Sequence, residues 1–556
     1  MAGLKRRVPM HSLRYFISMV GLFSKSGLLP WYARNPPGWS QLFLGTVCKG
    51  DFTHVIATKC QKGQKSQKKP SHLGPLDGSW QERLADVVTP LWRLSYEEQL
   101  KVCFCSFILD SSSVETMSQE SVEHSSFVKF EAQKKILQRL ESYIQMLNGV
   151  NVTTAVPKSE SLPCLLHPII PSPVINGYRN KSTFSVNRGP DGNPKTVGYY
   201  LGTWRDGNIV CVRSNNLKNI PEKHSQVAQG MDYWWWHGWI EAGRPIEGSC
   251  AAVIQYYEVF LRQSPLEPCL VFHEGGYWRE LIVRTNSQGH TMAIITFHPQ
   301  KLSQEELHVQ KETVKEFFIR GPGAACDLTS LYFQESTMTR CSHQQSPYQL
   351  LFGEPYIFEE LLSLKIRISP DAFFQINTAG AEMLYRTVGE LTGVNSDTIL
   401  LDICCGTGVI GLSLAQHTSQ VLGIELVEQA VEDARWTAAF NGITNSEFHT
   451  GRAEKILPGL LKSKEDGQSV VAVVNPARAG LHYKVIQAIR NCRAIRTLVF
   501  VSCKLHGEST RNVIELCCPP DPAKKLLGEP FVLQQAVPVD LFPHTPHCEL
   551  VLLFTR

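Results

Sequence analysis

The sequence lacks several features that would each indicate a particular class of protein. No apolar run approaches the roughly 20 residues that a membrane-spanning helix needs. The 17 cysteines are scattered and include no pair of C-x-x-C motifs, which argues against a structural zinc site or an iron–sulfur cluster. No internal repeat is recognisable. Reduced thiols in an intracellular compartment fit this cysteine usage best.

Acidic residues are absent from residues 1–50, and Asp51 is the first. The seven Lys and Arg residues of this segment give it a formal charge of +7. Because the whole chain has a net charge of +4, residues 51–556 carry 4 − 7 = −3. The body is therefore not globally basic, and any nucleic-acid binding must come from local patches. An acid-free start with Arg and Ser predicts a mitochondrial transit peptide and a matrix protein. A secretory signal and an unimported cytosolic form are the alternatives.

The composition changes along the chain and predicts four further segments. Residues 51–78 are polar and Lys-rich, which favours a linker or, alternatively, a basic arm that contacts phosphates. Residues 79–160 contain a helical period and form a helical or mixed region. Short β-branched and aromatic runs between turns predict a mostly antiparallel β domain over 161–364, with a helix near 248–262. Strand–helix alternation over 365–556 predicts an α/β domain with a doubly wound parallel sheet.

Within the last domain, the pattern predicts individual elements. Strands are expected at 397–403, 420–426, 469–474, 497–502 and 547–554. Helices are expected at 411–417, 428–441, 482–492 and 507–517.

A glycine turn follows the first of these strands. Asp402 ends the strand, and Gly406 and Gly408 allow the backbone to turn sharply and approach a ligand. Glu425 ends the next strand, where a carboxylate can accept hydrogen bonds from a ribose diol. Gly411 completes a dinucleotide fingerprint, so NAD stays open, whereas an acid before the turn favours S-adenosylmethionine. Both acids could instead cap the helices that follow.

Two later residues suggest nucleophilic chemistry. Cys503 follows an apolar strand at its carboxyl end, where open α/β sheets bind ligands, and Glu549 opens the last strand. An accessible thiol can act as a nucleophile, and a nearby carboxylate can act as a base. A buried small hydrophobe and a solvated strand end are the alternatives. His544 and His547 lack further spaced ligands, so no metal site is predicted.

Several ordered motifs resemble those of the RNA uracil-5-methyltransferase family. They are FFQIN at 373–377, LLDICCGTGVIGL at 400–412, GIEL at 423–426, NPARAG at 475–480, VSC at 501–503 and FPHTPHCELV at 542–551, with YRNK at 178–181 upstream. The resemblance covers roughly 365–556. It implies methylation of uracil carbon 5 with S-adenosylmethionine, Cys503 as the nucleophile that adds to carbon 6, and Glu549 as the proton acceptor.

The resemblance also implies binding roles. The expected cofactor residues are Gln375, Asp402, Gly406, Gly408, Glu425 and Asn475. The expected RNA contacts are Tyr178, Arg179, Lys181 and Arg478, of which the first three combine charge with a stacking surface. Asn475 stands where the family usually has Asp, and Lys504-Leu505 replaces Asn-Pro after the nucleophile. The iron–sulfur cysteines of some bacterial relatives are absent, so neither a metal nor a cluster is expected.

With the transit-like start, the expected substrate is mitochondrial tRNA, and small-subunit rRNA is a second candidate. No membrane contact and no obligate protein partner are evident. An RNA-binding or RNA-folding factor with little turnover is the alternative, motivated by Asn475 and Lys504. A methyltransferase acting on proteins or small molecules is disfavoured, because such enzymes need no Cys/Glu pair of this kind. The aromatic run at 231–239 fits either hydrophobic packing or stacking on RNA bases.

Overall fold

The computed structural model describes residues 79–100, 129–148, 162–202, 209–225, 253–269, 275–336, 347–462 and 469–556. The predicted transit peptide, the linker and the aromatic run at 231–239 lie outside these residues. In the part of the chain that is described, no helix has the length and apolar character to cross a bilayer.

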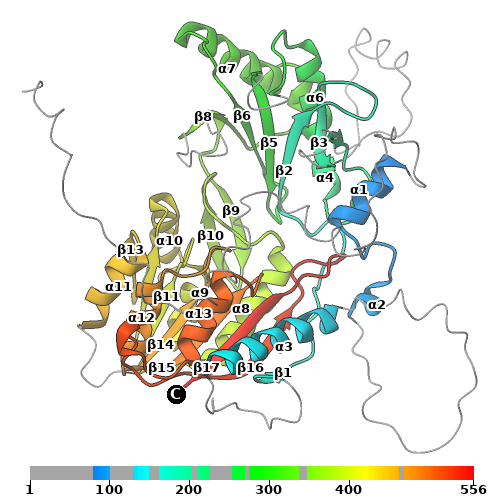
Figure 1. The fold of residues 1–556 in the computed structure, drawn as a ribbon. Helices are drawn as coiled ribbons and strands as arrows, with labels where there is room; N and C mark the ends of the chain where they lie inside the picture. Colours follow the sequence, from blue (N-terminus) through cyan, green and yellow to red (C-terminus); the bar gives the residue numbers. More distant parts are fainter. Residues whose placement is uncertain are drawn as a thin grey trace, which may run out of the picture. The chain divides into compact units, whose positions relative to one another are not determined.

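An eight-stranded sheet forms the centre of the C-terminal domain (Figure 1), with the strand order β1-β16-β17-β15-β14-β11-β12-β13. Its strands are β1 (Leu165–Leu166), β11 (Thr398–Ile403), β12 (Gln420–Glu425), β13 (Ser446–Thr450), β14 (Ser469–Val474), β15 (Ile495–Ser502), β16 (Val532–Val539) and β17 (Glu549–Thr555). The predicted α/β domain with a doubly wound sheet is confirmed.

One strand departs from the expected parallel arrangement. The strands β13, β12, β11, β14 and β15 are parallel neighbours, but β17 is antiparallel to both β15 and β16. A parallel partner would need a crossover of roughly a dozen or more residues, and the loop 540–548 between β16 and β17 is shorter than that. The predicted parallel sheet is therefore interrupted at β17, which runs antiparallel to both of its neighbours.

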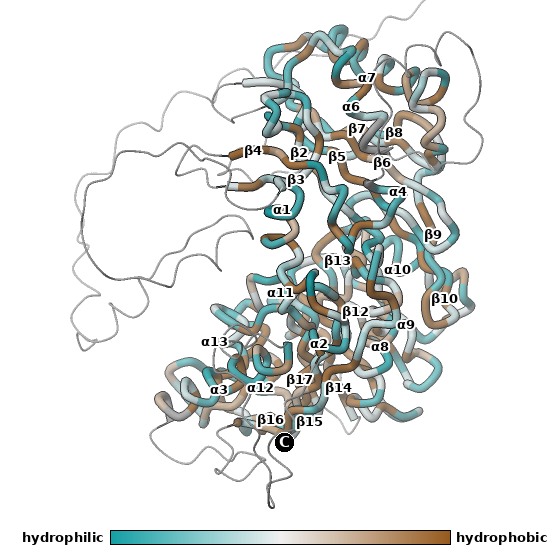
Figure 2. The backbone as a smooth tube through the Cα atoms, turned by 90° about the vertical axis from the view of Figure 1, so that its right-hand side faces the viewer, coloured by the Kyte–Doolittle hydropathy of each residue, from teal (hydrophilic) through white to brown (hydrophobic). Residues whose placement is uncertain are grey.

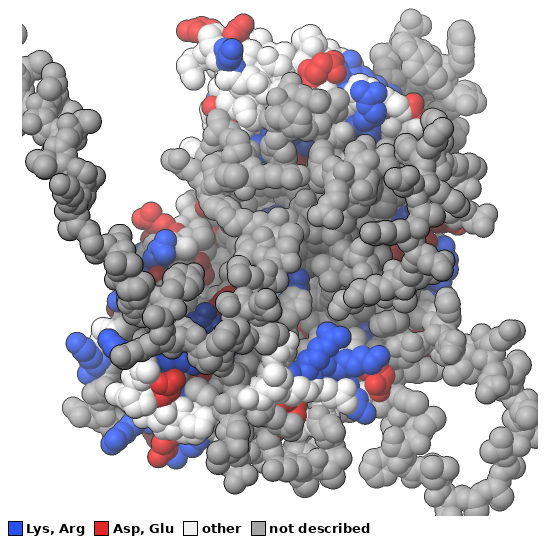
Figure 3. All heavy atoms as spheres, viewed as in Figure 1, with Lys and Arg blue, Asp and Glu red and all other residues white. Residues whose placement is uncertain are grey.

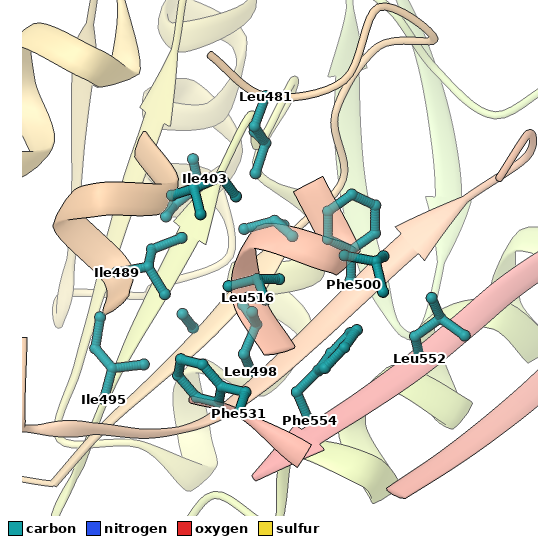
Figure 4. Close-up of a cluster of buried hydrophobic side chains, with 14 of the residues drawn as sticks. Ile403, Leu481, Ile489, Ile495, Leu498, Phe500, Leu516, Phe531, Leu552 and Phe554 are labelled. Carbon is teal, nitrogen blue, oxygen red and sulfur yellow. The ribbon is translucent and has the colours of Figure 1, made fainter. Parts of the chain in front are cut away.

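Helices cover both faces of this sheet. They are α3 (Lys129–Asn148), α8 (Thr378–Thr392), α9 (Val409–Leu414), α10 (Glu428–Phe440), α11 (Ala453–Lys462), α12 (Tyr483–Asn491) and α13 (Glu508–Cys517). Side chains of β11 alternate between two cores. Leu401 belongs to the core that includes side chains of α3, α11, α12 and α13, whereas Leu400 belongs to the core that includes side chains of α8, α9 and α10. Figure 4 shows the first of these cores, in which Phe500 of β15 lies opposite Leu552 of β17 and Leu498 lies opposite Phe554.

Strands that are covered on both faces should be apolar along their whole length. Every residue of β11 is buried, and β14 is buried from its second residue onward. In Figure 2 β14 is accordingly coloured brown, while the helices around it carry both teal and brown segments.

A second sheet of seven strands has the order β4-β3-β2-β5-β6-β7-β8. Its strands are β2 (Lys181–Asn187), β3 (Thr196–Leu201), β4 (Val210–Val212), β5 (Trp278–Thr285), β6 (Thr291–Phe297), β7 (Ser330–Glu335) and β8 (Tyr348–Gly353). All neighbours are antiparallel except β6 and β7, which α7 (Gln304–Ile319) connects. The predicted mostly antiparallel domain is confirmed, and the helix expected near 248–262 is α6 (Val253–Gln263).

The remaining helices and the hairpin each bury side chains in the core of one of the two sheets. The hairpin β9 (Ile357–Leu361) and β10 (Leu364–Ile368) packs with α8 and α10 in the second core of the C-terminal sheet. Helix α1 (Trp80–Val88) places Leu84 and Ala85 in the core of the seven-stranded sheet. Helix α2 (Tyr96–Leu100) follows it, and α3 buries Leu137 and Leu140 in the core of the C-terminal sheet. The described part of 79–160 therefore shares the cores of both domains.

Candidate active site

The antiparallel pairing of β15 and β17 brings Cys503 and Glu549 to one edge of the sheet. Ser502, the last residue of β15, lies opposite Leu550, the second residue of β17. The next residue outward on each strand is Cys503 on one side and Glu549 on the other. The turn that contains Arg478 follows β14, the parallel neighbour of β15, and so leaves the sheet at the same edge.

Arg478 interacts with both of these residues. Burial and the charge of Glu549 raise the pKa of the half-buried Cys503 thiol, and the hydrogen bond and charge of the Arg478 guanidinium partly oppose this rise. Burial raises the pKa of Glu549 to about 8, against the opposing effect of Arg478. Each of the three groups therefore lies within electrostatic reach of another, and they form one site.

The protonation of this site has a chemical consequence. At neutral pH both the thiol and the buried carboxyl are mostly protonated, because each has a raised pKa. Once Glu549 loses its proton, it is a stronger base than an exposed carboxylate, since basicity follows the pKa. A cation beside the pair favours both ionised forms. Arg478 therefore partly offsets the burial that disfavours the Cys503 thiolate, and the ionised Glu549 carboxylate can accept a proton from a bound substrate.

The glycine turn after β11 has the conformation that the sequence predicts. Gly406 and Gly408 have φ values of +56° and +73°, in the left-handed region. A Cβ at Gly408 would lie 2.7 Å from Phe448, whereas a Cβ at Gly406 would meet only the carbonyl oxygen of Phe373 at 3.8 Å. The turn is therefore packed on one side and open beside Gly406, where a ligand can approach the backbone.

Glu425 closes this turn. Its Oε2 accepts a hydrogen bond from Gly406 N at 3.0 Å, and its Oε1 accepts from Leu426 N at 2.7 Å and Val427 N at 3.0 Å. The N-cap of α10 is Val427, so the capping alternative for Glu425 is wrong. A half-buried carboxylate beside an open glycine turn is the arrangement expected at the ribose of a nucleoside cofactor.

Asp402 combines a capping contact with an unused acceptor. Its Oδ2 accepts from Gly411 N in the first turn of α9 at 2.9 Å, so the capping alternative holds for this oxygen. Its Oδ1 is buried and has no hydrogen-bond partner among the described residues. Burial raises the pKa of this carboxyl to about 7. An orphaned acceptor beneath the turn fits the polar amino-acid end of S-adenosylmethionine, and the open side at Gly406 fits its nucleoside.

Gln375 and Asn475 flank the same turn. Gln375 is buried and comes two residues after Phe373, whose carbonyl oxygen faces Gly406. Its own carbonyl oxygen accepts a hydrogen bond from Asn180 Nδ2 at 2.7 Å. Asn475 is half-buried, and its backbone N–H donates to Ile403 O at 3.2 Å, which ties the end of β14 to the end of β11. Their contacts with a cofactor stay predictions.

Tyr178 does not offer the stacking surface that the sequence predicts. It is buried, with 6% of its surface exposed, and its hydroxyl donates to Pro543 O at 3.2 Å. An aromatic residue next to basic ones is compatible with a core position as much as with RNA binding, and here tertiary packing decides. The prediction of RNA stacking by Tyr178 is therefore wrong, and the residue holds the loop before Glu549.

Arg179 and Lys181 are half-buried beside Arg284, which lies opposite Lys181 in the pair β2–β5. Arg179 Nε donates to Lys181 O at 3.2 Å. Burial, Arg284 and Arg179 together lower the pKa of Lys181 to about 7, so only part of its charge is present at neutral pH. Their contact with RNA stays a prediction. On the described surface in Figure 3, basic and acidic side chains both occur, in keeping with the mixed charge of the body.

Residues from far upstream that sequence reasoning missed surround the loop 540–548. They are Leu91, Tyr96, Gln99, Lys129 and Asn176. No local pattern marks them, because their partners lie hundreds of positions away.

Within the described ranges, no group of three or more His, Cys, Asp or Glu residues could hold a metal ion.

Comparison with known proteins gives consistent matches. A methyltransferase domain model matches residues 394–505. The chain is 87% identical over 556 residues to "tRNA (uracil-5-)-methyltransferase homolog B" of Homo sapiens, covering 100% of both chains. It is 69% identical over 547 residues to the Mus musculus protein of the same name, covering 98% of this chain and 100% of that one.

More distant proteins also match. "tRNA (uracil-5-)-methyltransferase homolog A" of Homo sapiens is 37% identical over 478 residues, covering 85% of this chain and 68% of that one. Among solved structures, the Pyrococcus abyssi tRNA (uracil-54, C5)-methyltransferase in complex with S-adenosyl-L-homocysteine aligns with a TM-score of 0.46 at 20% identity. That alignment covers 76% of this chain and 83% of the other.

Proposed function

We propose a covalent mechanism for this chain, which belongs to the tRNA (uracil-5-)-methyltransferase family and is an S-adenosylmethionine-dependent RNA uracil methyltransferase. In this mechanism Cys503 bonds to carbon 6 of the target uracil before carbon 5 is methylated. The observation that carries the proposal is the pairing of Ser502 with Leu550, because it brings Cys503 and Glu549 together beside Arg478.

Uracil carbon 5 is a poor nucleophile until carbon 6 is attacked. The Cys503 thiolate adds to carbon 6, and the electrons of the C5=C6 bond move through the ring to oxygen 4 as an enolate. When bound, S-adenosylmethionine supplies a methyl group on a positively charged sulfur, which carbon 5 of this activated ring can accept. Arg478 supports the first step because it favours the thiolate form of Cys503.

Glu549 completes the reaction. Its carboxylate removes the hydrogen from carbon 5, and the electron pair of that C–H bond forms the new C5=C6 bond. The bond between carbon 6 and Sγ breaks at the same time, which returns Cys503 as a thiolate and releases the methylated base. The raised pKa of Glu549 suits this step, because a more basic carboxylate removes a carbon-bound proton more readily.

The cofactor would be held by the glycine turn and its surroundings. Glu425 would bind the ribose hydroxyls, Gly406 would let the nucleoside approach the backbone, and Asp402 Oδ1 would accept from the amino group. Gln375 and Asn475 would also bind the cofactor, where its pocket meets that of the uracil. Asn475 carries no charge where the family usually has Asp, so its amide would bind by hydrogen bonds alone.

The proposed substrate is mitochondrial tRNA, with small-subunit rRNA as a second candidate. The names of the related proteins refer to tRNA, and the acid-free start of the chain supports import into mitochondria. Mapping ribothymidine in mitochondrial tRNA and rRNA, with and without the protein, tests this part. If ribothymidine disappears from only one RNA class when the protein is absent, that class is the substrate. If the ribothymidine of mitochondrial RNA is the same with and without the protein, the proposed mitochondrial substrate and localisation are contradicted.

A trapping experiment tests the mechanism itself. In 5-fluorouridine tRNA carbon 5 carries fluorine instead of a removable proton, so the wild-type protein should stall as a denaturant-stable adduct. Cys503→Ala should form no adduct. Cys518→Ala is the matched control, because Cys518 is also half-buried but lies beyond α13, where it contacts Arg490. An adduct with Cys503→Ala would contradict the proposed nucleophile.

A second candidate function is an RNA-binding factor with little turnover, favoured by Asn475 and Lys504 in place of the usual family residues. The same experiment separates the two functions. If wild-type protein binds tRNA but neither forms the adduct nor transfers methyl groups, the binding function is supported and the enzymatic one is not.

A further inference from the structure

The loop that leads to Glu549 is held mainly by side chains from other parts of the chain. It spans 540–548, between the last residue of β16 and the first residue of β17. Leu541 O accepts from Asn377 Nδ2 at 3.2 Å, and Pro543 O accepts from Tyr178 at 3.2 Å. The loop is therefore part of a long-range network, although its sequence suggests only a connection between strands.

Asp540 begins the loop in a buried ion pair. Its Oδ1 lies 2.6 Å from Lys129 Nζ, and both side chains are fully buried. Its Oδ2 accepts from the Tyr96 hydroxyl at 2.9 Å, and Lys129 Nζ also donates to Phe542 O at 3.0 Å. A buried charge needs such partners, since an unpaired carboxylate in the interior is strongly disfavoured. Asp540 is thus pinned by α2 and α3 at once.

His544 occupies the middle of the loop in a strained conformation. Its φ of +67° lies in the left-handed region that few residues other than glycine adopt. The Gln99 side chain makes two contacts with His544. Its Oε1 accepts a hydrogen bond from His544 N at 2.8 Å, and its Nε2 lies 3.1 Å from Nδ1 of the His544 ring. Nε2 of the ring lies 2.8 Å from Asn176 Oδ1, and the carbonyl oxygen accepts from Leu91 N at 3.0 Å.

These contacts form a clamp, defined here as Tyr96, Gln99 and Lys129. A strained backbone persists only where its surroundings hold it, so without the clamp the loop should relax. Among the described residues, the side-chain hydrogen bonds and the ion pair of the clamp join it to Leu94, Ser172 and the loop, and not to Cys503 or the glycine turn. Relaxation would therefore first displace Glu549, which directly follows the loop, and would leave the nucleophile in place.

We infer that Tyr96, Gln99 and Lys129 are positioning residues, which hold the Glu549 carboxylate where it can remove the hydrogen from carbon 5. The inference rests on the proposed function, and it adds that the segment before the β domain contributes to one particular step. That step is the release of the methylated base: the C5–H pair forms the C5=C6 bond, the proton goes to Glu549, and the C6–S bond breaks.

The test separates this step from the addition of Cys503. The full chain carrying Gln99→Leu is given tRNA and cofactor with a labelled methyl group, and the label is followed in the covalent complex and in free RNA. Release should slow by about tenfold or more, because small displacements of a reacting group reduce rates steeply. The labelled covalent complex should accumulate, while adduct formation on 5-fluorouridine tRNA should stay close to that of wild type.

Two further variants make the result secure. Tyr96→Phe removes two hydrogen bonds of the hydroxyl, one to Asp540 and one from Ser172 N, with little change in volume. It should fold and should slow release in the same direction as Gln99→Leu but less. Glu97→Gln, on the exposed side of the same helix, is the matched control and should behave as wild type.

The possible results have distinct meanings. If Gln99→Leu and Tyr96→Phe reduce adduct formation and release by the same factor, the clamp is only structural and the inference is wrong. If wild-type protein forms no adduct on 5-fluorouridine tRNA, the proposed function fails, and the inference falls with it. Accumulation of the labelled complex in both variants, but not in Glu97→Gln, supports positioning of Glu549.

Discussion

Glu425 and Gly406 are joined by a hydrogen bond of 3.0 Å between Oε2 and the backbone N–H, across the ends of two neighbouring strands. Two more N–H groups, of Leu426 and Val427, donate to the other oxygen. The carboxylate thus stabilises the glycine turn and still lies at the open side of it. Glu425 therefore both holds the backbone of the glycine turn and supplies the negative charge of the proposed cofactor site.

Neutralising this carboxylate should weaken cofactor binding. Glu425→Gln keeps the size of the side chain but removes the charge from its hydrogen bonds, which should reduce affinity for S-adenosylmethionine by about 10- to 100-fold. Calorimetric titration with the cofactor measures this. Glu428→Gln, an exposed acid at the start of α10, is the control. Equal affinities of the two variants would contradict the role of Glu425.

Adding a methyl group at Gly408 should destabilise the fold through a clash. The new Cβ would lie 2.7 Å from Phe448 and 3.0 Å from Ala434, at a φ of +73°. We expect Gly408→Ala to lower the free energy of unfolding by about 2–4 kcal/mol, as judged by urea denaturation. Gly442→Ala has a similar φ of +69° but nothing within 4 Å, so it should lose only about 1 kcal/mol. Equal losses would show that backbone strain alone matters.

Glu549 should make stability depend on pH. Burial raises its folded-state pKa to about 8, whereas an exposed Glu ionises near pH ~4.3, so the unfolded chain loses this proton first. Stability should therefore fall as the pH rises between these two values. Glu549→Gln carries no such proton and should be more stable than wild type at pH 8 by on the order of 1–3 kcal/mol.

Thermal melts of both proteins across this pH range measure the difference. The gap between variant and wild type should widen with pH and then level off above the folded pKa. A gap that is constant across the range would mean that the carboxyl is already ionised in the folded protein. In activity assays the same variant should accumulate the covalent complex, because no carboxylate is left to take the proton.

Arg478 should set the pH dependence of adduct formation. Because its charge lowers the pKa of Cys503, Arg478→Gln should raise that pKa and reduce the thiolate fraction at neutral pH. The rate of adduct formation on 5-fluorouridine tRNA should fall by about tenfold at pH 7 and partly recover at higher pH. Arg493→Gln is the control, since that exposed residue precedes β15 at the opposite edge of the sheet. If Arg478→Gln lowers the rate of adduct formation by the same factor at every pH, Arg478 does not act through the pKa of Cys503.

Much of the C-terminal domain could be predicted from local patterns, and the exceptions are informative. The strands β11, β12, β14, β15 and β17 have continuous apolar runs, and the structure confirms them. Strand β13 was missed because Phe448 is its only large apolar residue. Strand β16 carries two glutamines and Pro538, and α11 contains Pro458, so neither shows a clear period. Packing against neighbours, not local preference, stabilises these elements.

The sequence by itself determined which side chains end the strands: the glycine turn, Glu425, Cys503 and Glu549 all follow from motifs and apolar runs. Only the tertiary structure decided that β17 runs antiparallel between β15 and β16, and that Glu549 therefore meets Cys503. It also decided that Tyr178 is buried and that Gln99 holds His544, at a sequence separation of 445. Periodicity reports only neighbours a few residues apart, whereas strand order and buried polar contacts are set by the packing of the whole molecule.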